Sequence, residues 1–583
     1  MSQRQKSTTG RWRRAVVFWF FLGIGARLFA FEVALTVDAT APGRPVNSNL
    51  VGNNMPWPGG NAGTPASGNG MTLFANRQIQ PEFFRRLKSI GKVPMRYPGG
   101  DWADSYDWRM GIGPAAARRR FSYHAAAHES SVASDYVNFG TLEFLDYCRR
   151  IECIPVLQVN MHQLSAKQAA DDAETIAANA ADWVRYVNIQ NGSPTGAPNV
   201  EYWELGNEPY LKRKADWGYL SPSDFANRVV LVMKKMLQQD RRIKFLIPFA
   251  TDTWSGKDYC VSPGANNECN IGAVVGDQLG YSTTLLRIIQ QNSLCSRVHA
   301  LALHYYMPLI GTSPPPSDVA LYWATMAGTN TVWKNIVAVK KIWKQAVSPS
   351  CRNSADQEYV PKLAITEFNS LYTTDKEMLQ TNYSASQAGA MYVADAIRLM
   401  AELDDVEMAT NWSASANGQF GAISFKNDGR DFPVYVRPHY FALLFASELL
   451  QPNGNYLPLV YEKNPAGNAH VEIIGKSHGF PAMPLTTALA TVQVAQKKIR
   501  ILLLNKDVGS VADVKLALKG ATALAARIRR VEPRPGAPFE VLESSPAIFD
   551  SGSHVIIQNG SGQSVLWWNM PPTSFALVEI DIS

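Results

Sequence analysis

Residues 200–210 read VEYWELGNEPY, and residues 362–370 read KLAITEFNS. In both stretches a short apolar run leads to a glutamate, Glu208 in the first and Glu367 in the second. Apolar runs of this kind are typical of parallel strands that are buried on both faces. An ionised side chain at the end of such a strand is costly unless it is paired or hydrogen-bonded. The two stretches therefore predict buried parallel strands that each present a carboxylate at the carboxyl end.

Six further β-rich runs surround these two, and amphipathic helical stretches alternate with them. The predicted strands are residues 49–53, 93–97, 154–160, 200–206, 245–250, 298–305, 362–366 and 406–411. The predicted helices are residues 82–90, 140–150, 169–187, 223–239, 331–346 and 386–403. This alternation predicts an α/β fold, a (β/α)8 TIM barrel over residues 48–450. A doubly wound open sheet is the alternative, but no glycine-rich dinucleotide fingerprint follows the first strand.

Beyond the barrel the chain changes character. Short alternating runs, such as KIRILLLN from residue 498 and SFALVEIDI from residue 574, are separated by Gly, Pro, Asn and Ser. This pattern predicts a C-terminal β-sandwich over residues 451–583. Residues 31–47 begin with a similar alternation and precede the barrel. We expect this N-terminal strand to cross over and pair within the sandwich.

The amino terminus carries most of the excess positive charge. The 583 residues have a formal charge of +7, and residues 1–30 hold six basic residues and no acidic one. The uncharged run over residues 15–26 is too short to span a bilayer but suits a secretory signal. We therefore expect a signal peptide over residues 1–30 and a secreted or periplasmic protein, with an uncleaved membrane anchor as the alternative. Without this segment little net charge remains, so no nucleic-acid partner is expected.

Six cysteines in a chain of this length exclude a disulfide scaffold. An exported chain offers two candidate disulfides, and two further cysteines flank a helix end with their pairing left open: Cys260 with Cys269, Cys295 with Cys351, and Cys148 and Cys153. No cysteine has metal-ligand spacing to a histidine, so neither a metal nor another cofactor is predicted.

Polar and aromatic side chains gather at the predicted strand ends, which is where a TIM barrel carries its functional groups. The candidates for substrate contact are Asn54, Trp57, Trp108, Asn160, Asn207, His304, Tyr306 and Trp412. The aromatic residues among them are candidates for stacking on sugar faces. Arg96 is expected to pair with a barrel carboxylate. Glu204 lies four residues before Glu208 and is expected to point into the barrel interior rather than to reach substrate.

Glu208 and Glu367 form the candidate catalytic pair. They end the fourth and seventh strands, which lie on opposing sides of a barrel, so the two carboxylates are predicted to face each other across a sugar. Cleavage of a glycosidic bond needs one carboxylic acid to protonate the leaving oxygen. It also needs a second carboxylate that attacks the anomeric carbon or activates water. The pair therefore predicts a glycoside hydrolase.

Several stretches resemble the retaining glycoside hydrolases whose acid/base ends strand four and whose nucleophile ends strand seven. These are RYPGGDWADSYDWRMGIGP from residue 96, EYWELGNEP from residue 201, LHYY from residue 303 and ITEFNS from residue 365. Within that group the closest likeness is to the α-L-arabinofuranosidases with a barrel and a C-terminal sandwich. The resemblance implies that Glu208 is the acid/base and Glu367 the nucleophile. It also implies that Asn207 binds the sugar 2-hydroxyl and that Tyr306 orients Glu367.

The motifs depart from that family at two places. Those arabinofuranosidases usually have Asp-Glu-Trp where this chain has Thr366-Glu367-Phe368, and Pro209 is common among xylosidase-, iduronidase- and glucuronidase-like relatives. A retaining mechanism predicts carboxyl groups about 5–5.5 Å apart, whereas a gap beyond about 6.5 Å indicates inversion. Burial and the neighbouring charge are expected to raise the pKa of Glu208.

The expected partner is a polysaccharide or oligosaccharide, with arabinofuranosides as the first substrate class. An endo-acting β-glycanase or a β-glycosidase of the same group is the alternative enzyme. The long connections over residues 54–80 and 98–137 are compatible with a pocket or with a groove. A non-catalytic carbohydrate-binding protein is the alternative from another class, and the retention of both glutamates argues against it.

Overall fold

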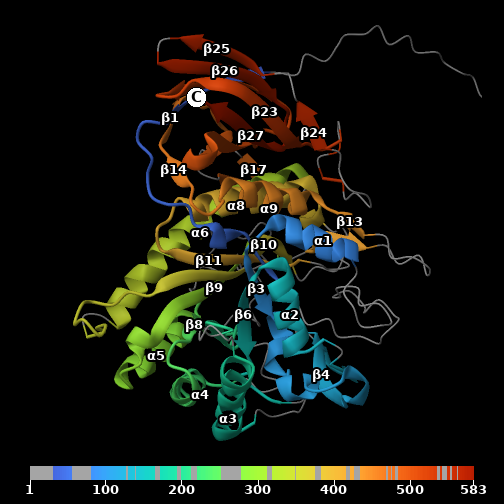
Figure 1. Cartoon of the computed structure of the whole chain (residues 1–583), viewed down its shortest axis with the longest axis vertical. Coiled ribbons are helices and arrows are strands. Elements are labelled where there is room, and N and C mark those ends of the chain that lie inside the picture. The colour runs from blue at the N-terminus through green and yellow to red at the C-terminus, as the bar shows by residue number, and fades with distance from the viewer. Residues whose placement is uncertain are drawn as a thin grey trace, which may run out of the picture.

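A barrel forms the lower part of the molecule and a layered β-structure lies above it in the computed structural model (Figure 1). The structure describes residues 30–583 except for residues 56–80, 127–128, 138, 165–170, 193–198, 212–219, 251–277, 311–317, 348–349, 374–382, 415–419, 426–433, 468–469, 474–475, 480–482, 535–536, 538, 541–547, 552–554 and 561. Residues 1–29 of the predicted signal peptide, Trp57, and the pair Cys260 and Cys269 lie outside the described residues.

Eight parallel strands close into a barrel in the order β10-β11-β2-β3-β6-β7-β8-β9. Their bounds are β2 Gly52–Asn54, β3 Pro94–Tyr97, β6 Ile154–Val159, β7 Tyr202–Leu205, β8 Lys244–Pro248, β9 Val298–Ile310, β10 Lys362–Thr373 and β11 Val406–Asn411. This closed order confirms the TIM barrel and excludes the open doubly wound sheet. The first strand begins later than predicted, because the short 3₁₀ helix η1 (Ser48–Val51) occupies the residues before Gly52.

Helices surround the barrel (Figure 1). They are α1 Pro81–Ile90, α2 Thr141–Ile151, α3 Ala173–Val184, α4 Pro222–Gln239, α5 Gln278–Gln291, α6 Asp318–Ala346, α8 Gln387–Ala401 and α9 Pro438–Leu449. The start of α4 follows the rules for helix termini: the Ser221 side chain accepts a hydrogen bond from the Asp224 N–H, and Pro222 fills the first turn. Helix α6 begins well before the predicted residue 331. Its internal glycine, Gly328, packs so close to β9 that an added Cβ would lie 2.5 Å from the Met307 side chain.

Two hairpins extend the connections that follow barrel strands. The hairpin of β4 (Arg120–Ala126) and β5 (Glu129–Tyr136) follows β3, and the hairpin of β12 (Ile423–Phe425) and β13 (Val434–Val436) follows β11. Neither was predicted from the sequence. Side chains from six of the strands form one apolar cluster in the interior of the barrel, and this cluster supports the polar rim. Its members are Val156, Tyr202, Leu246, Ala300, Ala302, Ala364 and Met408.

Two antiparallel-rich sheets form the predicted C-terminal sandwich. One has the order β15-β1-β22-β26-β25 and the other β14-β20-β21-β27-β23-β24. The bounds are β1 Ala30–Asp38, β14 Asn455–Leu457, β15 Leu459–Lys463, β20 Thr486–Gln493, β21 Lys498–Asn505, β22 Val511–Lys519, β23 Ala523–Val531, β24 Ile548–Ser551, β25 Ile556–Gly560, β26 Gln563–Met570 and β27 Ser574–Ile582. Two small hairpins, β16 (Ala466–Gly467) with β19 (Met483–Pro484) and β17 (His470–Ile473) with β18 (Lys476–Gly479), lie in the connection before β20.

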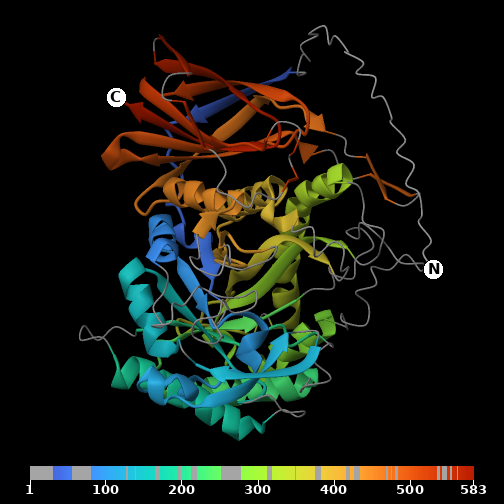
Figure 2. The ribbon, with the colours of Figure 1, turned by 90° about the vertical axis from the view of Figure 1, so that its right-hand side faces the viewer.

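Strand β1 enters the sandwich although it precedes the barrel in sequence. It pairs parallel with β22 and antiparallel with β15, and in Figure 2 it is the blue strand among orange and red ones. Its inward residues Val33, Leu35 and Val37 join the same apolar cluster as Val514 and Leu516 of β22. The chain therefore ties both of its ends into one sandwich core.

Helices α8 and α9 lie between the barrel and the sandwich (Figures 1 and 2). The ring of Phe445 on α9 packs against Phe575 of β27 with centroids 5.8 Å apart. Asp395 of α8 is fully buried and accepts hydrogen bonds from Lys506 Nζ at 2.6 Å and from Thr487 Oγ1 at 2.8 Å. Apolar and ionic contacts thus join the two parts.

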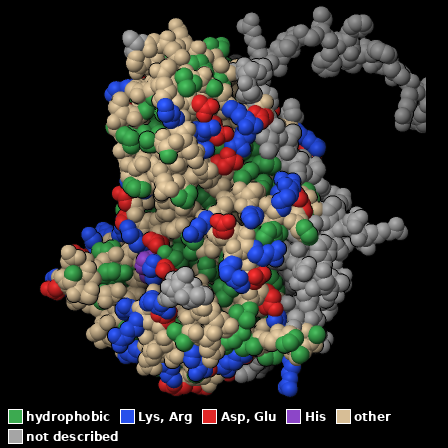
Figure 3. All heavy atoms as spheres, in the orientation of Figure 1, with side chains coloured by type: hydrophobic (Ala, Val, Ile, Leu, Met, Phe, Trp, Pro, Cys, Tyr) green, Lys and Arg blue, Asp and Glu red, His purple; other side chains and the backbone are tan. Residues whose placement is uncertain are grey.

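Two disulfides lie in the described part of the barrel. Cys295 is bonded to Cys351, which confirms the predicted pair, and Cys148 is bonded to Cys153 across the end of α2. On the face that Figure 3 shows, basic and acidic side chains are interspersed over both the barrel and the sandwich.

Candidate active site

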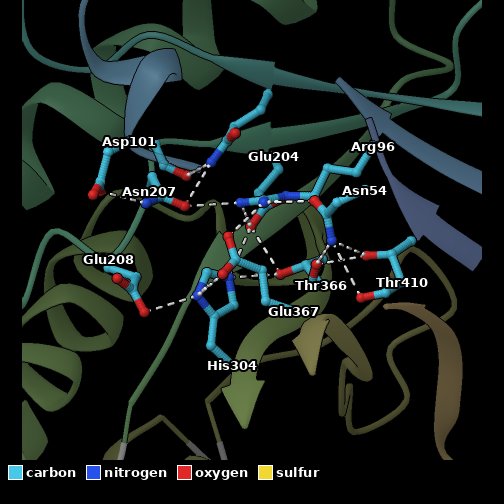
Figure 4. A network of polar contacts seen from close by, with 12 residues as sticks. Asn54, Arg96, Asp101, Glu204, Asn207, Glu208, His304, Thr366, Glu367 and Thr410 are labelled. Carbon is cyan, nitrogen blue, oxygen red and sulfur yellow. Dashed lines mark hydrogen bonds and ion pairs between the residues drawn. The ribbon is translucent and has the colours of Figure 1, made fainter. Parts of the chain in front are cut away.

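The two candidate catalytic glutamates point toward the same group of polar side chains (Figure 4). Glu208 follows its strand as predicted, whereas strand β10 runs on past Glu367 instead of ending at the predicted residue 366. Glu208 follows β7 in a turn in which Gly206 has φ 93° and Glu208 itself has φ 39°. Glu367 lies within β10, where the pairing with β9 is irregular between Ile365 and Glu367. The side chains of Glu208 and Glu367 are 12% and 7% exposed. Both are therefore largely buried yet reach the rim.

Glu367 is held at both carboxylate oxygens. Arg96 Nη1 donates to Oε1 at 2.8 Å, and the Tyr306 hydroxyl donates to Oε2 at 2.6 Å. Burial and the charge of Glu208 raise the pKa of Glu367, while His304 and Arg96 oppose this rise. Burial and the charge of Glu367 raise the pKa of Tyr306 well above its ordinary value, so Tyr306 remains a neutral donor. These donors favour the ionised, nucleophilic form of Glu367.

The side chain of His304 lies close to both Glu208 and Glu367. His304 Nδ1 lies 3.0 Å from Glu208 Oε1 and 3.6 Å from Glu367 Oε2. One ligand atom from each of these three residues lies within 4.8 Å of the others. At least one oxygen of each carboxylate therefore lies within 4.8 Å of the other carboxylate, which fits the separation of about 5–5.5 Å in retaining glycosidases better than the separation of about 6.5–9.5 Å in inverting ones.

The same three groups are close enough together to hold a cation. However, both oxygens of Glu367 already accept hydrogen bonds, and the Arg96 guanidinium lies directly beside them. Although burial opposes it, the charges of Glu204 and Glu367 raise the pKa of Arg96, which therefore stays positive and repels a cation. The donor set favours a hydrogen-bonded carboxylate pair over a metal centre.

Arg96 pairs internally, as the sequence predicted. Its Nε and Nη2 bind the Glu204 carboxylate, Nη1 donates to Asn54 Oδ1 at 2.9 Å, and Nη2 donates to Asn207 Oδ1 at 3.0 Å. One buried guanidinium therefore connects β2, β3, β7 and β10.

Asn207 is fixed beside the acid/base candidate. Its Oδ1 accepts from Arg96 and from Gln158 Nε2, both at 3.0 Å, and its Nδ2 donates to Asp101 Oδ1 at 2.9 Å. Sequence reasoning did not select Gln158 and Asp101 as site residues. Both stand at predicted strand ends. Gln158 lies two residues before Asn160, so its side chain points to the same side of the strand, and this spacing could have identified it.

Three predicted substrate contacts need correction. Trp108 is in the core, where it stacks on Trp183 and donates from Nε1 to the Asn179 carbonyl at 3.1 Å. The side chain of Asn160 is hydrogen-bonded to backbone groups. Its Nδ2 donates to the Tyr106 carbonyl, and its Oδ1 accepts from two N–H groups of the following turn. Asn54 is fully buried and donates to the Thr366 carbonyl at 2.8 Å. All three act as supports of the rim.

Trp412 remains at the rim and is partly exposed. It follows β11, and its ring packs against Gly100, where an added Cβ would lie 2.5 Å from the ring. Gly100 has φ 65°, so glycine suits this position both by conformation and by space. Tyr306 packs edge-on against Phe420, with ring centroids 5.6 Å apart. Tyr306, whose hydroxyl binds Glu367, is thus itself held by an aromatic neighbour.

Part of the chain is similar in sequence to known arabinofuranosidases. Residues 86–259 match the family model of the alpha-L-arabinofuranosidase 1 domain. α-L-Arabinofuranosidase C of Emericella nidulans is 34% identical over 141 residues, which are 24% of this chain and 26% of that protein. The sequence match thus spans about a quarter of the length of this curated relative.

Solved structures extend the likeness in fold to nearly the whole chain. The GH51 α-L-arabinofuranosidase of Thermotoga petrophila superimposes with a TM-score of 0.67 at 19% identity, covering 94% of this chain and 100% of that one. The family 51 α-L-arabinofuranosidase AbfB of Bifidobacterium longum gives 0.67 at 17% identity, covering 94% and 99%. Residues 86–259 are thus similar to the α-L-arabinofuranosidase 1 domain, and the chain shares the barrel-plus-sandwich fold of the family 51 α-L-arabinofuranosidase structures.

Proposed function

We propose that the protein is a retaining α-L-arabinofuranosidase in which Glu208 is the acid/base and Glu367 the nucleophile. The observation that carries the proposal is the close approach of the two carboxylates around His304, within 4.8 Å. Arg96 and Tyr306 stabilise the ionised form of Glu367, which is the form that attacks. No room for an intervening water is needed when the second carboxylate itself is the nucleophile.

The proposed reaction is a double displacement. Glu367 attacks the anomeric carbon while Glu208 gives its proton to the departing glycosidic oxygen, which leaves a glycosyl ester on Glu367. Water then attacks the same carbon, Glu208 takes up the proton of that water, and the Glu367 carboxylate leaves. Both inversions occur at one carbon, so the product keeps the configuration of the substrate.

The proposed substrates are α-L-arabinofuranosides carried by polysaccharides or oligosaccharides. The matched domain and the names of the relatives support this sugar. The endo-acting β-glycanase is the second candidate, and a substrate panel separates the two. Aryl arabinofuranosides, xylosides and glucuronides, with a set of polysaccharides, should give activity first on the arabinofuranosides.

Product configuration tests the mechanism. When hydrolysis of an aryl α-L-arabinofuranoside is followed by NMR, the first arabinose released is expected to be the α-anomer, and the β-anomer should grow in only by mutarotation. First release of the β-anomer would show that the carboxylates act by inversion. Activity on none of these glycosides or polysaccharides would favour the non-catalytic alternative.

Replacing Glu208 with Ala tests its role as the acid/base. Because an activated leaving group such as 4-nitrophenol departs with little protonation, the variant should lose about 10²–10⁴-fold on unactivated arabinosides and far less on the activated one. Added azide should then accelerate turnover and give an arabinosyl azide of retained configuration, since azide attacks the ester on Glu367. Equal losses on both substrates, without an azide product, would contradict the assignment.

We propose further that the chain is exported. The basic and then apolar character of residues 1–30 supports this, as do the disulfides Cys148–Cys153 and Cys295–Cys351, which persist in oxidising compartments. Among the helices of the described ranges, none combines the length and apolarity that crossing a bilayer requires.

A further inference from the structure

A third carboxylate lies beneath the catalytic pair. Glu204 of β7 is 1% exposed and occupies the centre of the polar network in Figure 4. It is too deep to reach substrate, and the proposed double displacement does not use it. A buried carboxylate is costly unless it is paired, and Glu204 is paired in two directions. Each direction ends on one of the two catalytic carboxylates.

The first connection runs through Arg96 to the nucleophile. Glu204 binds Nε and Nη2 of Arg96, while Nη1 of the same guanidinium donates to Glu367 at 2.8 Å. The guanidinium is planar, so holding two of its nitrogens fixes the direction of the third. Glu204 therefore sets both the position of Arg96 and the net charge that Glu367 experiences.

The second connection runs through Thr366 and His304 to the acid/base. The Thr366 hydroxyl donates to Glu204 Oε1 at 3.0 Å, which leaves its oxygen to accept from His304 Nε2 at 3.1 Å. His304 therefore carries a proton on Nε2 and presents Nδ1 to Glu208 Oε1 at 3.0 Å. One proton lies in this last hydrogen bond: on Nδ1 it makes an imidazolium, and on Oε1 it makes Glu208 the acid.

The electrostatics of His304 agree with a retained proton. Burial lowers the pKa of His304, but the charges of Glu367 and Glu208 outweigh burial and raise it above the ordinary value. Glu204 Oε1 lies 3.9 Å from His304 Nε2 and adds a further negative charge. The groups that contact Glu204 directly are Arg96 of β3, Thr366 of β10 and His304 of β9. The charged groups one contact further away are Glu367 of β10, reached through Arg96, and Glu208, reached through His304, and the neutral Asn54 and Asn207 accept from Arg96 (Figure 4).

We propose that Glu204 is a positioning residue that sets the protonation states of the two catalytic carboxylates. It acts on Glu367 through Arg96, and on Glu208 through Thr366 and His304. The inference rests on the proposed function, since it concerns the two carboxylates of that mechanism. It goes beyond it in assigning the pH range of the reaction to a residue that never meets the sugar.

The variant Glu204→Gln tests the proposal, because it keeps the shape of the side chain and removes the charge. Loss of a negative charge eases ionisation of Glu367 and weakens retention of the proton between His304 and Glu208. Both limbs of the pH profile of kcat/KM should therefore move to lower pH, by about one pH unit. Because an amide oxygen accepts from Arg96 while the amide NH₂ cannot, a guanidinium that still contacts Glu367 but is less firmly oriented should in addition lower kcat by about 10²-fold. The probe is 4-nitrophenyl α-L-arabinofuranoside.

Glu407→Gln is the matched control. Glu407 is a carboxylate of β11 that accepts from the Tyr202 hydroxyl at 2.8 Å and pairs with His299, at the opposite end of the barrel. A purely structural carboxylate of this kind should alter thermal stability and leave both limbs of the pH profile in place. If Glu204→Gln behaves like Glu407→Gln, with lower stability and unmoved limbs, the proposal is overturned.

A second pair of variants separates the two connections and keeps the test valid if Glu204→Gln folds poorly. Thr366→Val removes the hydroxyl between Glu204 and His304 without changing any charge. It should lower kcat by about 10-fold on phenyl arabinofuranoside, which needs protonation, and much less on the 4-nitrophenyl substrate. Thr366→Ser keeps the hydroxyl and should restore the rate.

Equal losses on both substrates, or no rescue by Thr366→Ser, would overturn the His304 connection. The failure of the proposed function itself looks different, because the unaltered protein would then hydrolyse neither arabinofuranoside.

Discussion

The Glu367→Gln variant is expected to lose hydrolysis of aryl α-L-arabinofuranosides by about 10⁴-fold or more in kcat/KM. The amide has nearly the same shape as the carboxylate but cannot attack the anomeric carbon or carry the glycosyl ester. It also leaves the Arg96 guanidinium facing a neutral group, so the charge that stabilises the developing sugar cation is lost. Steady-state rates on the 4-nitrophenyl substrate measure this effect.

A second substitution at the same position distinguishes the nucleophile from other essential residues. Glu367→Ala opens space for azide where the carboxylate stood, and azide then attacks the anomeric carbon once. The expected product is an arabinosyl azide of inverted configuration, opposite to the product predicted for Glu208→Ala. Retention of configuration with Glu367→Ala, or near-normal hydrolysis by Glu367→Gln, would show that another group is the nucleophile.

The fold could be predicted because its signals are local. Several barrel strands lie in largely apolar runs, as in KLAIT before Glu367, and a strand buried on both faces needs no partner information to be recognised. The alternation in β22, with Val514, Leu516 and Leu518 inward, indicates a sandwich strand in the same way. Helix α6 was predicted too short because Gly328 interrupts its pattern, and only its packing on β9 explains that glycine.

The site could be predicted only in part, because a strand end gives the location of a side chain and not its partners. Glu208 and Glu367 lie together since barrel closure brings strand ends to one rim. Trp108 and Asn160 also follow strand ends, yet Trp108 stacks on Trp183 and Asn160 is hydrogen-bonded to the local backbone. The role of Arg96 in joining four carboxylate or amide groups depends on contacts more than 40 residues apart in sequence. Contacts between residues so far apart leave no periodic pattern in the sequence from which they could be predicted.

The Asp395→Asn variant is expected to lower the free energy of unfolding by about 3–5 kcal/mol, because it breaks a buried ion cluster by removing one partner. Asp395 accepts from Lys506 Nζ at 2.6 Å and from Arg398 Nε at 2.7 Å. Although burial opposes it, these cations hold the pKa of Asp395 far below its ordinary value. Its stabilising contribution is therefore full above the ordinary pKa of an aspartate and is lost only as pH falls through the much lower folded value.

Denaturant unfolding followed by tryptophan fluorescence measures this loss, and Asp550→Asn is the matched control. Asp550 pairs with Arg527 in the same sandwich, but the two side chains are 42% and 55% exposed, so its loss should cost less than about 1 kcal/mol. Adding Lys506→Met to Asp395→Asn should recover part of the stability, since the unpaired buried cation is then gone. Because Asp395 is on α8 and Lys506 follows β21, a loss as small as that of Asp550→Asn would mean that this ion pair contributes little to joining the barrel to the sandwich.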